Sequence, residues 1–415
     1  DRARLPRFLS QPIATTFSAQ ILPLPLTVKI FHVLPLLVPL VNLIVVPLLG
    51  VVLWLCLLTS FVVWLNAGVG LIFGHALLPF VECIRWLVGL SQRVPGSYTF
   101  LTSPTSVAMA FFWAALFPLV IPMRARQAAL RWFGVITLFT LCFLCWKPRL
   151  IPEVVFLDVG HGDSIFFQWN SGKTLLVDGG DSSDHSDLGA SVVCPFLWQK
   201  GITRLDYVIC THPDRDHIGG LLTVFERFDV GEIFLGVPQE KNPLEKALLE
   251  QCRRRDISVR FVSKGDRVEF EDGFIEILNP VPEVSYSNSN DGSVVACVGW
   301  SGIRFLLTGD VGRRIADSVA VSASPSEVLK IPHHASTHSY SAALLDKTNP
   351  LVAVVTGGTS LSAGLGSNVW RKELSRRGVA VFNMTDCGAV RFRQLGEEIE
   401  VTAQRPRDVT SISLN

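Results

Sequence analysis

Four side chains of metal-binding type are packed into the segment T-H-P-D-R-D-H-I-G-G at residues 211–220. They are His212, Asp214, Asp216 and His217. The segment follows an apolar run that ends at Cys210 and precedes an apolar helical pattern, so it reads as a strand-to-helix loop. Imidazole and carboxylate groups at this density suit one or two divalent ions with nitrogen and oxygen ligands. The alternative is a polar turn in which Asp216 caps the next helix, which leaves both histidines unexplained.

Two later apolar runs end in the same residue types. L-L-T-G-D at 306–310 delivers Asp310 to the end of a predicted strand, and L-K-I-P-H-H-A-S at 329–336 carries His333 and His334 into a loop. Taken alone, a Gly-Asp turn or a His pair after a strand is usually structural. Together with the first motif, three strand ends that present Asp or His can complete a two-metal cage.

The elements that must position these residues begin at Pro152, where the pattern changes to short β-rich runs separated by Gly and Asp turns. Strands are predicted at 154–158, 164–169, 174–178, 206–210, 232–236, 258–262, 274–278, 294–299, 303–308, 327–331, 351–355, 379–383 and 388–393. Helices are predicted at 187–199, 217–228, 243–255, 312–322, 338–346 and 367–377. This order predicts two sheets with helices outside them.

Composition divides the chain near residue 147. The 415 residues are 49% hydrophobic and 18% charged, which excludes a disordered protein and argues against an ordinary soluble enzyme. Residues 1–146 carry nine Lys and Arg against two Asp and Glu, a balance of +7, whereas the remainder carries 28 against 34, a balance of −6. We expect a polytopic membrane region over 1–147, a soluble domain over 150–402 and a polar, frayed tail over 403–415.

The membrane region contains three to five apolar segments. Residues 33–66 contain no charge and are long enough for one kinked span, or for a re-entrant segment plus a span. Three prolines in this run favour a broken path. Residues 107–122 and 130–146 are further candidates, and 69–92 reads equally as an interfacial helix. This number of segments favours part of a channel or transporter over a passive anchor.

Basic residues predict the orientation. Arg124, Arg126 and Arg131 lie between the last two apolar segments, and the positive-inside rule puts that loop in the cytoplasm. The final span then delivers the soluble domain to the outer side, although Lys147 and Arg149 beyond it argue the other way. The chain begins D-R-A-R, without an initiator Met or a cleavable signal peptide, so we expect more membrane protein upstream.

The first motif resembles H-x-H-x-D-H, the signature of the metallo-β-lactamase superfamily. The resemblance implies an α+β domain, an αββα sandwich with metals at one edge between the sheets, here preceded by α-helical membrane segments. Asp214 stands where the family has His, and residues 218–309 contain no His for a further ligand. The first metal site is therefore expected to be oxygen-rich, which favours Mn²⁺ or Mg²⁺ over Zn²⁺, or to fill only with substrate present.

Other segments narrow the resemblance to ComEC-type competence channels, which take up single-stranded DNA. F-L-D-V-G-H-G-D-S at 156–164, L-L-V-D-G-G at 175–180, N-D-x-S at 290–293 and L-T-G-D at 307–310 are similar to the extracytoplasmic domain of that family. The usual sequences of two motifs in that family are D-V-G-Q-G-D and H-H-G-S. This chain has D-V-G-H-G-D and H-H-A-S at those motifs. In the apolar half, A-Q-I-L-P-L-P and V-N-L-I-V-V-P resemble the end of the competence membrane domain.

The resemblance implies a site for two divalent ions, Mn²⁺, Zn²⁺ or Mg²⁺. Carried over by motif, the ligands are His212 and Asp214 for the first ion, Asp216 and His217 for the second, Asp310 as the bridge, and His333 to complete the second site. His333 is preferred to His334 because related motifs place the ligand immediately after the strand.

Neighbouring residues receive supporting roles. His334 or His338 would contact phosphate or protonate the leaving oxygen, and Lys330 would hold non-bridging oxygens. Asp291 is the candidate to replace the missing His ligand. Three aspartates would organise the loops around the site or simply form turns: Asp158, Asp163 and Asp178.

The function implied is uptake of single-stranded DNA through an inner-membrane channel, with a metal-dependent nuclease that degrades one strand. The partners implied are single-stranded DNA, membrane lipid and other proteins of the competence machinery. Three alternatives stay open. One is another hydrolase of the superfamily, acting on a thioester, lactone or β-lactam, and the membrane half argues against it. Another is a catalytically inactive channel domain, which metal occupancy would decide. The third is an unrelated anchored phosphoesterase with a small substrate.

The acidic balance of the second half argues against a strong grip on DNA, because affinity for nucleic acid usually comes from basic surface. Two basic clusters are candidate backbone contacts. They are Arg253 to Arg255, and Arg371 and Lys372 with Arg376 and Arg377. A solvated helix face explains them equally well.

Overall fold

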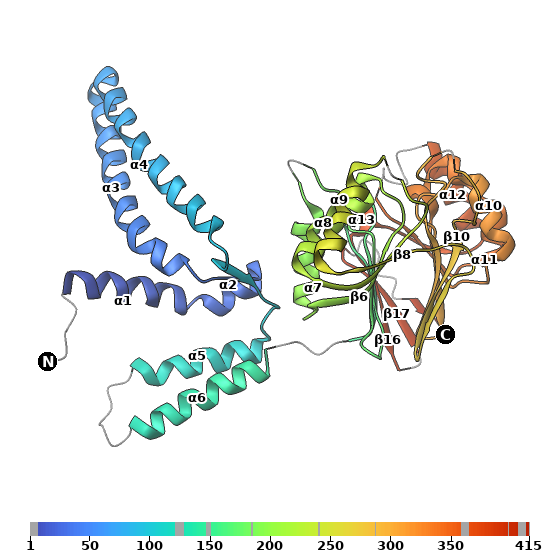
Figure 1. The fold of residues 1–415 in the computed structure, drawn as a ribbon, viewed down its shortest axis with the longest axis horizontal. Helices are drawn as coiled ribbons and strands as arrows, with labels where there is room; N and C mark the ends of the chain where they lie inside the picture. The colour runs from blue at the N-terminus through green and yellow to red at the C-terminus, as the bar shows by residue number, and fades with distance from the viewer. Residues whose placement is uncertain are drawn as a thin grey trace. The chain divides into compact units, whose positions relative to one another are not determined.

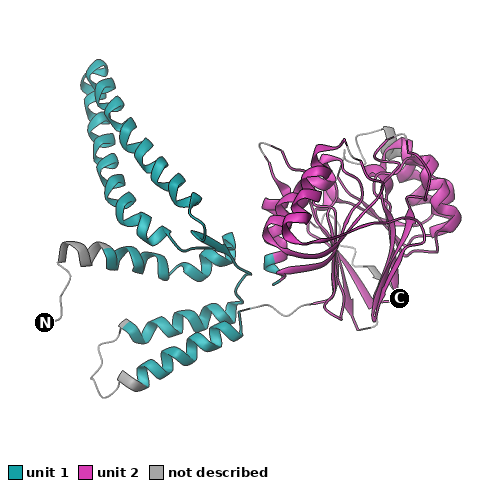
Figure 2. Ribbon diagram, in the orientation of Figure 1, with its two compact units in different colours: residues 1–148, 198–201 teal, residues 149–197, 202–415 magenta. Residues whose placement is uncertain are grey.

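The computed structural model describes residues 7–120, 128–146, 151–183, 186–239, 241–286, 288–357, 365–396, 398–405 and 412–414. The chain forms two compact units (Figure 2). Unit 1 comprises residues 1–148 with 198–201, and unit 2 comprises 149–197 with 202–415. Each unit is described by itself.

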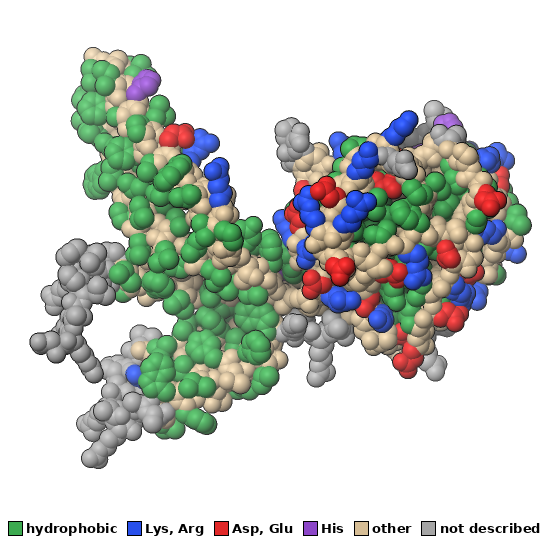
Figure 3. All heavy atoms as spheres, in the orientation of Figure 1, with side chains coloured by type: hydrophobic (Ala, Val, Ile, Leu, Met, Phe, Trp, Pro, Cys, Tyr) green, Lys and Arg blue, Asp and Glu red, His purple; other side chains and the backbone are tan. Residues whose placement is uncertain are grey.

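Unit 1 is helical, with one short antiparallel strand pair. Its elements are α1 (Arg7–Ile21), α2 (Leu24–Phe31), β1 (Val33–Pro35), α3 (Val38–Leu65), α4 (Ala67–Arg93), β2 (Tyr98–Phe100), α5 (Ser106–Val120) and α6 (Ala128–Leu144). Figure 3 shows hydrophobic side chains over most of the visible face of this unit, whereas charged side chains gather on unit 2. Such exposed apolar surface fits a lipid environment.

Two described helices, α3 and α4, are long and apolar enough to cross a membrane. A third span results if the helical segments 13–21 and 24–31, bent by 52°, count as one; α5 and α6 are shorter apolar helices. Of the two paths predicted for 33–66, the structure has the single span, because α3 runs from Val38 to Leu65 and continues through Pro47. The segment 69–92, left open between interface and span, is one helix of spanning length.

The α3–α4 pair packs closely at Gly70. A Cβ atom there would lie 2.2 Å from Val63 Cγ2 and 2.8 Å from Val63 Cα, so only glycine allows this approach. Helix α4 starts at a cap, in which Asn66 Oδ1 accepts a hydrogen bond from the Val69 amide at 3.2 Å. Arg124 and Arg126, on which the predicted orientation depends, lie outside the described residues.

Unit 2 contains two mixed sheets. The larger has the strand order β18-β17-β16-β3-β4-β5-β6-β7-β8, and the smaller has the order β15-β14-β13-β12-β11-β10-β9. The strands of the larger sheet are β3 (Glu153–Phe156), β4 (Ile165–Gln168), β5 (Thr174–Val177), β6 (Arg204–Cys210), β7 (Asp229–Leu235), β8 (Ser258–Phe261), β16 (Val390–Leu395), β17 (Glu398–Ala403) and β18 (Ile412–Leu414). Those of the smaller are β9 (Arg267–Phe270), β10 (Gly273–Asn279), β11 (Val295–Trp300), β12 (Ile303–Leu307), β13 (Val328–Lys330), β14 (Val352–Val355) and β15 (Ala380–Asn383).

Helices cover both outer faces (Figure 1). They are α7 (Cys194–Gln199), α8 (Arg215–Arg227) and α9 (Pro243–Arg255) on the larger sheet, and α10 (Arg313–Ser322), α11 (Ala342–Thr348) and α12 (Leu365–Arg376) on the smaller. A single turn, α13 (Met384–Cys387), follows β15. The predicted order of helix, sheet, sheet and helix is confirmed.

The main core lies between the two sheets, and alternate residues of each strand point into it. Val154 and Phe156 of β3 contribute from one sheet, and Phe305 of β12 contributes from the other. The Phe305 ring lies edge-on to Phe167 at 5.3 Å and to Phe392 at 5.0 Å. These contacts fix how the two sheets face each other, and thereby which strand ends meet at the edge of the sandwich.

All thirteen predicted strands are present in unit 2. The prediction missed β9, β17 and β18, of which β18 lies inside the tail expected to be frayed. Within that tail, residues 406–411 and 415 lie outside the described residues.

Candidate metal centre

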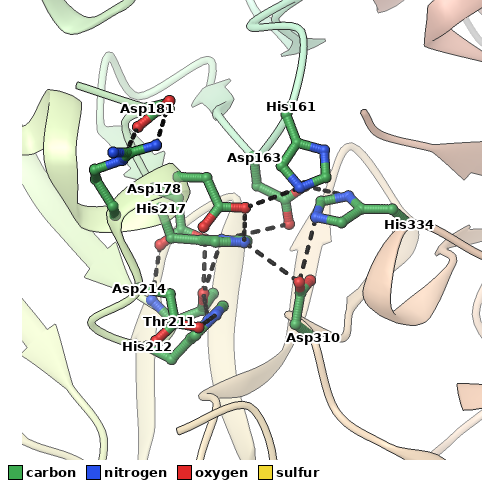
Figure 4. Close-up of polar contacts among 12 residues, drawn as sticks. His161, Asp163, Asp178, Asp181, Thr211, His212, Asp214, His217, Asp310 and His334 are labelled. Atoms are coloured by element: carbon green, nitrogen blue, oxygen red, sulfur yellow. Dashed lines mark hydrogen bonds and ion pairs between the residues drawn. The ribbon is translucent and has the colours of Figure 1, made fainter. Parts of the chain in front are cut away.

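One edge of the sandwich gathers the predicted metal-binding side chains from both sheets (Figure 4). In the larger sheet, β5 and β6 run parallel, so the residues after Val177 and Cys210 emerge at the same edge, beside the loop from β3 to β4. In the smaller sheet, β12 and β13 also run parallel and end there, followed by Asp310 and His334. The site is therefore built from loops that follow rigid strands.

Asp178 organises the part of the site that comes from the larger sheet. Its Oδ2 accepts hydrogen bonds from His217 Nδ1 at 2.8 Å and from the Thr211 hydroxyl at 2.7 Å, and its Oδ1 accepts from the Thr211 amide at 2.8 Å. The Thr211 hydroxyl, having donated to Asp178, lies 3.0 Å from His212 Nδ1 and accepts from it. Because Asp178 and the hydroxyl oxygen act as acceptors, both imidazoles carry a proton on Nδ1.

His334 is held in the same way from the smaller sheet. Its Nδ1 donates to the carbonyl of Thr356 at 2.5 Å. Its Nε2 lies 3.2 Å from Asp310 Oδ2, and His217 Nε2 lies 3.5 Å from the same oxygen. His217 and His334 therefore both turn Nε2 towards Asp310.

The buried Nε2 atoms of His217 and His334 have no hydrogen-bond partner among the described residues. A buried polar atom without a partner is costly, and imidazoles tied at Nδ1 present Nε2 as metal ligands do. Three groups have ligand atoms within 4.8 Å of one another: His212 with His217 and Asp310, His161 with Asp216 and His334, and Asp163 with Asp178 and His217. The donor set fits divalent ions that accept nitrogen and oxygen ligands.

The carboxylates set the protonation of the histidines. Burial opposes protonation of His217, but Asp310 and Asp178 outweigh it and hold the pKa of His217 well above its usual value. Burial also opposes protonation of His334, and Asp310 again outweighs it and raises the pKa. For His212, burial and the neighbouring His217 lower the pKa to about 4, so this ring is neutral at pH 7.

Lys330 lies inside the site rather than at its mouth. Its Nζ is 2.5 Å from Asp163 Oδ2, 3.2 Å from Asp310 Oδ1 and 2.8 Å from the carbonyl of Gly309, and the side chain is fully buried. The three acceptors use all of its donors. This geometry speaks against the predicted contact of Lys330 with substrate oxygens and makes it a positioning residue that balances two buried carboxylates.

The structure favours His334 over His333 as the histidine from the smaller sheet, against the preference drawn from the sequence. His333 lies outside the three ligand groups. Residues 333–335 have φ values of 47°, 50° and 64°, although none is glycine. This left-handed turn turns the second histidine of the pair, rather than the first, towards Asp310. Backbone strain of this kind is often found at functional sites.

Four other candidates lie apart from the ligand groups. Asp214 Oδ1 accepts from the Ser289 hydroxyl at 2.8 Å, although its Oδ2 lies 3.7 Å from His212 Nε2. Asp291 Oδ1 accepts from the Gly312 amide at 3.2 Å, so the structure does not support it as the substitute ligand. Asp158 pairs with Arg405 at 3.0 Å, and His338 is exposed in the short 3-10 helix Thr337–Ser339.

Sequence reasoning missed His161 and the two threonines that orient histidines, Thr211 and Thr356. His161 Nε2 lies 3.5 Å from Asp216 Oδ2, and its ring lies 4.9 Å from the His334 ring. The signal for His161 was present in D-V-G-H-G-D, where a histidine stands between two glycines. The threonines carry no such signal, because their role depends on strands that are distant in sequence.

Two family models match the chain. The metallo-beta-lactamase superfamily model matches residues 157–358, and the competence protein model matches residues 2–126. ComE operon protein 3 of Bacillus subtilis is 24% identical over 98% of this chain and 54% of its own length. Competence protein ComA of Neisseria gonorrhoeae is 26% identical over 91% of this chain and 50% of its own length. The chain carries the two regions of a ComEC-type competence protein.

This ComEC-type chain spans about half the length of these two curated relatives. Among solved structures, the metallo-beta-lactamase fold protein YhfI from Bacillus subtilis is 15% identical, with a TM-score of 0.36, over 56% of this chain and 96% of that chain. The metallo-β-lactamase domain implies a metal-dependent hydrolase that binds divalent ions, and the apolar helices with the competence region imply a membrane protein.

Proposed function

We propose that this ComEC-type chain takes part in the uptake of single-stranded DNA across the inner membrane and that its metallo-β-lactamase domain is a metal-dependent nuclease. One observation carries the proposal. In a chain with a competence membrane region, His217 and His334, tied at Nδ1, turn Nε2 towards one shared carboxylate, Asp310, and His212 offers a further imidazole nitrogen within 4.8 Å of it. That arrangement is suited to holding ions that act on a phosphodiester.

Two divalent ions are the proposed cofactors, with His212, His217 and Asp310 around one and Asp216 and His334 around the other. When bound, such ions supply Lewis acidity at a phosphodiester oxygen and water of lowered pKa. The chain's own residues do the rest. Asp178, Thr211 and Thr356 fix the histidine rings, and Lys330 keeps Asp163 and Asp310 ionised in a buried place.

The open side of the cluster is where a phosphodiester would approach. The side chain of Asp216 is 24% exposed, whereas those of His217 and Lys330 are buried. The basic cluster at 253–255 lies away from this side, because Arg255 contacts the Phe225 carbonyl and Asp229 at the end of α8 opposite Asp216. Arg371 and Lys372 of the other cluster are exposed. A weak grip on DNA is consistent with this arrangement.

The test uses the whole chain in detergent micelles with labelled single-stranded DNA and Mn²⁺, beside Asp216→Asn and a matched control, Asp181→Asn. Asp181 pairs with Arg215 outside the cluster. Cleavage that Asp216→Asn abolishes and Asp181→Asn leaves intact supports the proposal. Cleavage of a thioester, lactone or β-lactam instead of DNA would assign another hydrolase of the superfamily. Bound metal without turnover of any of these substrates would indicate an inactive channel domain.

The proposed orientation, with the metallo-β-lactamase domain on the outer face, rests on Arg124, Arg126 and Arg131 and on the positive-inside rule. Protease added to spheroplasts should remove the domain when it is outside and spare it when it is inside. Competence-machinery partners are proposed from the family alone and are testable by crosslinking in the same cells.

A further inference from the structure

We propose that His161 is a protein ligand of the ion assigned above to Asp216 and His334, which is called the outer ion below. His161 would complete the ligand set of that ion. The inference deepens the proposed function and rests on the site holding metal. The ligand atoms of these three residues lie within 4.8 Å of one another, and the His161 ring faces the His334 ring at a centroid distance of 4.9 Å (Figure 4).

The loop that carries His161 is clamped from two sides. Gly162, with a φ of +97°, lies so close to the next motif that a Cβ atom would be 1.9 Å from the carbonyl oxygen of Asp216. On the other side, a Cβ atom on Gly357 would be 2.8 Å from the carbonyl oxygen of Gly160 and 3.2 Å from the Cα of His161. Backbone therefore packs on backbone at both contacts, and the position of His161 is fixed although its side chain is 65% exposed.

The neighbouring ligands leave a place for an imidazole. Asp214, at the position where the superfamily has a histidine, accepts a hydrogen bond from Ser289 and lies outside the ligand groups. His334 Nε2 is buried and makes no hydrogen bond among the described residues, and it lies 3.2 Å from Asp310 Oδ2, a second group suited to binding an ion. Within this group of three, the predicted motifs supply Asp216 and His334, and His161 supplies a third ligand atom.

A surface histidine that merely rests on His334 is the competing explanation. It predicts that the ring contributes nothing to metal affinity. Coordination predicts an outer ion with two imidazoles and one carboxylate, a set that suits Zn²⁺, Mn²⁺ or Co²⁺ better than an oxygen-rich site does. The exposure of His161 also leaves this ion open to solvent, where a phosphodiester can reach it.

The test titrates the whole chain in detergent micelles with Co²⁺ alone, without DNA. The matched control is His338→Ala, which removes an exposed histidine outside the ligand groups. We expect two Co²⁺ ions in the wild type and in His338→Ala. In His161→Ala, one ion should bind at least about tenfold more weakly while the other is unchanged. His161→Cys should restore a ligand and introduce a thiolate-to-Co²⁺ charge-transfer band that His338→Cys does not show.

Unchanged affinity for both ions in His161→Ala, or no charge-transfer band in His161→Cys, would overturn the inference. A wild type that binds fewer than two Co²⁺ ions would overturn it as well. The proposed nuclease function fails separately: a wild type that binds two ions, depends on His161 for one of them and leaves DNA intact would keep this inference and remove that function.

Discussion

His217 Nε2 lies 3.5 Å from Asp310 Oδ2, and the two residues follow strands of different sheets. Each sheet thus supplies half of the cluster. The histidine and its supporting Asp178 come from the larger sheet, and Asp310, Lys330 and His334 come from the smaller. Substitutions can therefore test the interactions within each half of the cluster separately from the interactions between the two halves.

Lys330→Met is expected to destabilise the metal-free chain by about 3–5 kcal/mol, because it removes the ammonium that pairs with the buried carboxylates of Asp163 and Asp310. The measurement is the denaturant midpoint in micelles with chelator present. Lys347→Met, which removes an exposed lysine, should change stability by less than about 0.5 kcal/mol. Wild-type stability combined with a raised KM for DNA would instead indicate the substrate contact predicted from the sequence.

His334→Ala and His333→Ala form a matched pair in one turn. Because only His334 Nε2 reaches Asp310, His334→Ala should weaken metal binding by at least about tenfold, whereas His333→Ala should leave affinity within about twofold. Equilibrium dialysis against Mn²⁺ measures both variants. The reverse ranking would restore His333 as the ligand.

Gly162→Ala and Gly160→Ala test the clamp on the β3–β4 loop. Both glycines have positive φ, and a left-handed alanine costs about 1–2 kcal/mol at either position. Gly160 has open space around its missing Cβ, whereas that of Gly162 would meet Asp216. Gly162→Ala should therefore lose about 1–3 kcal/mol more, measured by chemical denaturation. Equal losses of stability in the two variants would mean that the β3–β4 loop shifts to accommodate the added methyl group at no cost in free energy.

Metal binding near neutral pH should release protons. The pKa values of His217 and His334 are raised, so each ring keeps a proton to higher pH than a free imidazole does, and an ion must displace it. Affinity should accordingly rise with pH, up to about tenfold per pH unit for each proton displaced. Calorimetry in buffers of different ionisation enthalpy counts the protons, and a count of zero would show that the rings are already neutral.

The pattern of unit 2 was predictable because its strands are apolar and end at Gly and Asp turns. The edge strand β9 was not predicted, because its sequence R-V-E-F at 267–270 is half exposed and carries two charges. Helix α8 begins at Arg215, two residues before the predicted start, with Asp214 at the N-cap position but without a side-chain capping hydrogen bond. Local hydrophobic pattern therefore predicted elements better than it predicted their ends.

The site was predictable down to the strand ends that form it. The choice between His333 and His334 was not, because it depends on a left-handed turn in residues without glycine. Nor was the internal position of Lys330, since a lysine after a buried strand gives no sign of whether its ammonium meets solvent or two carboxylates. These details depend on long-range packing between sheets, which local sequence does not record.

The division of the cluster between the sheets has a consequence for biosynthesis. A chain synthesised only as far as α9 already holds His212 and His217, but Asp310 and His334 follow later, after β12 and β13. The ligand set is complete only when the second sheet has formed and docked on the first. Ions that bind the complete cluster would therefore bind last, and they would stabilise only chains whose two sheets are correctly packed together.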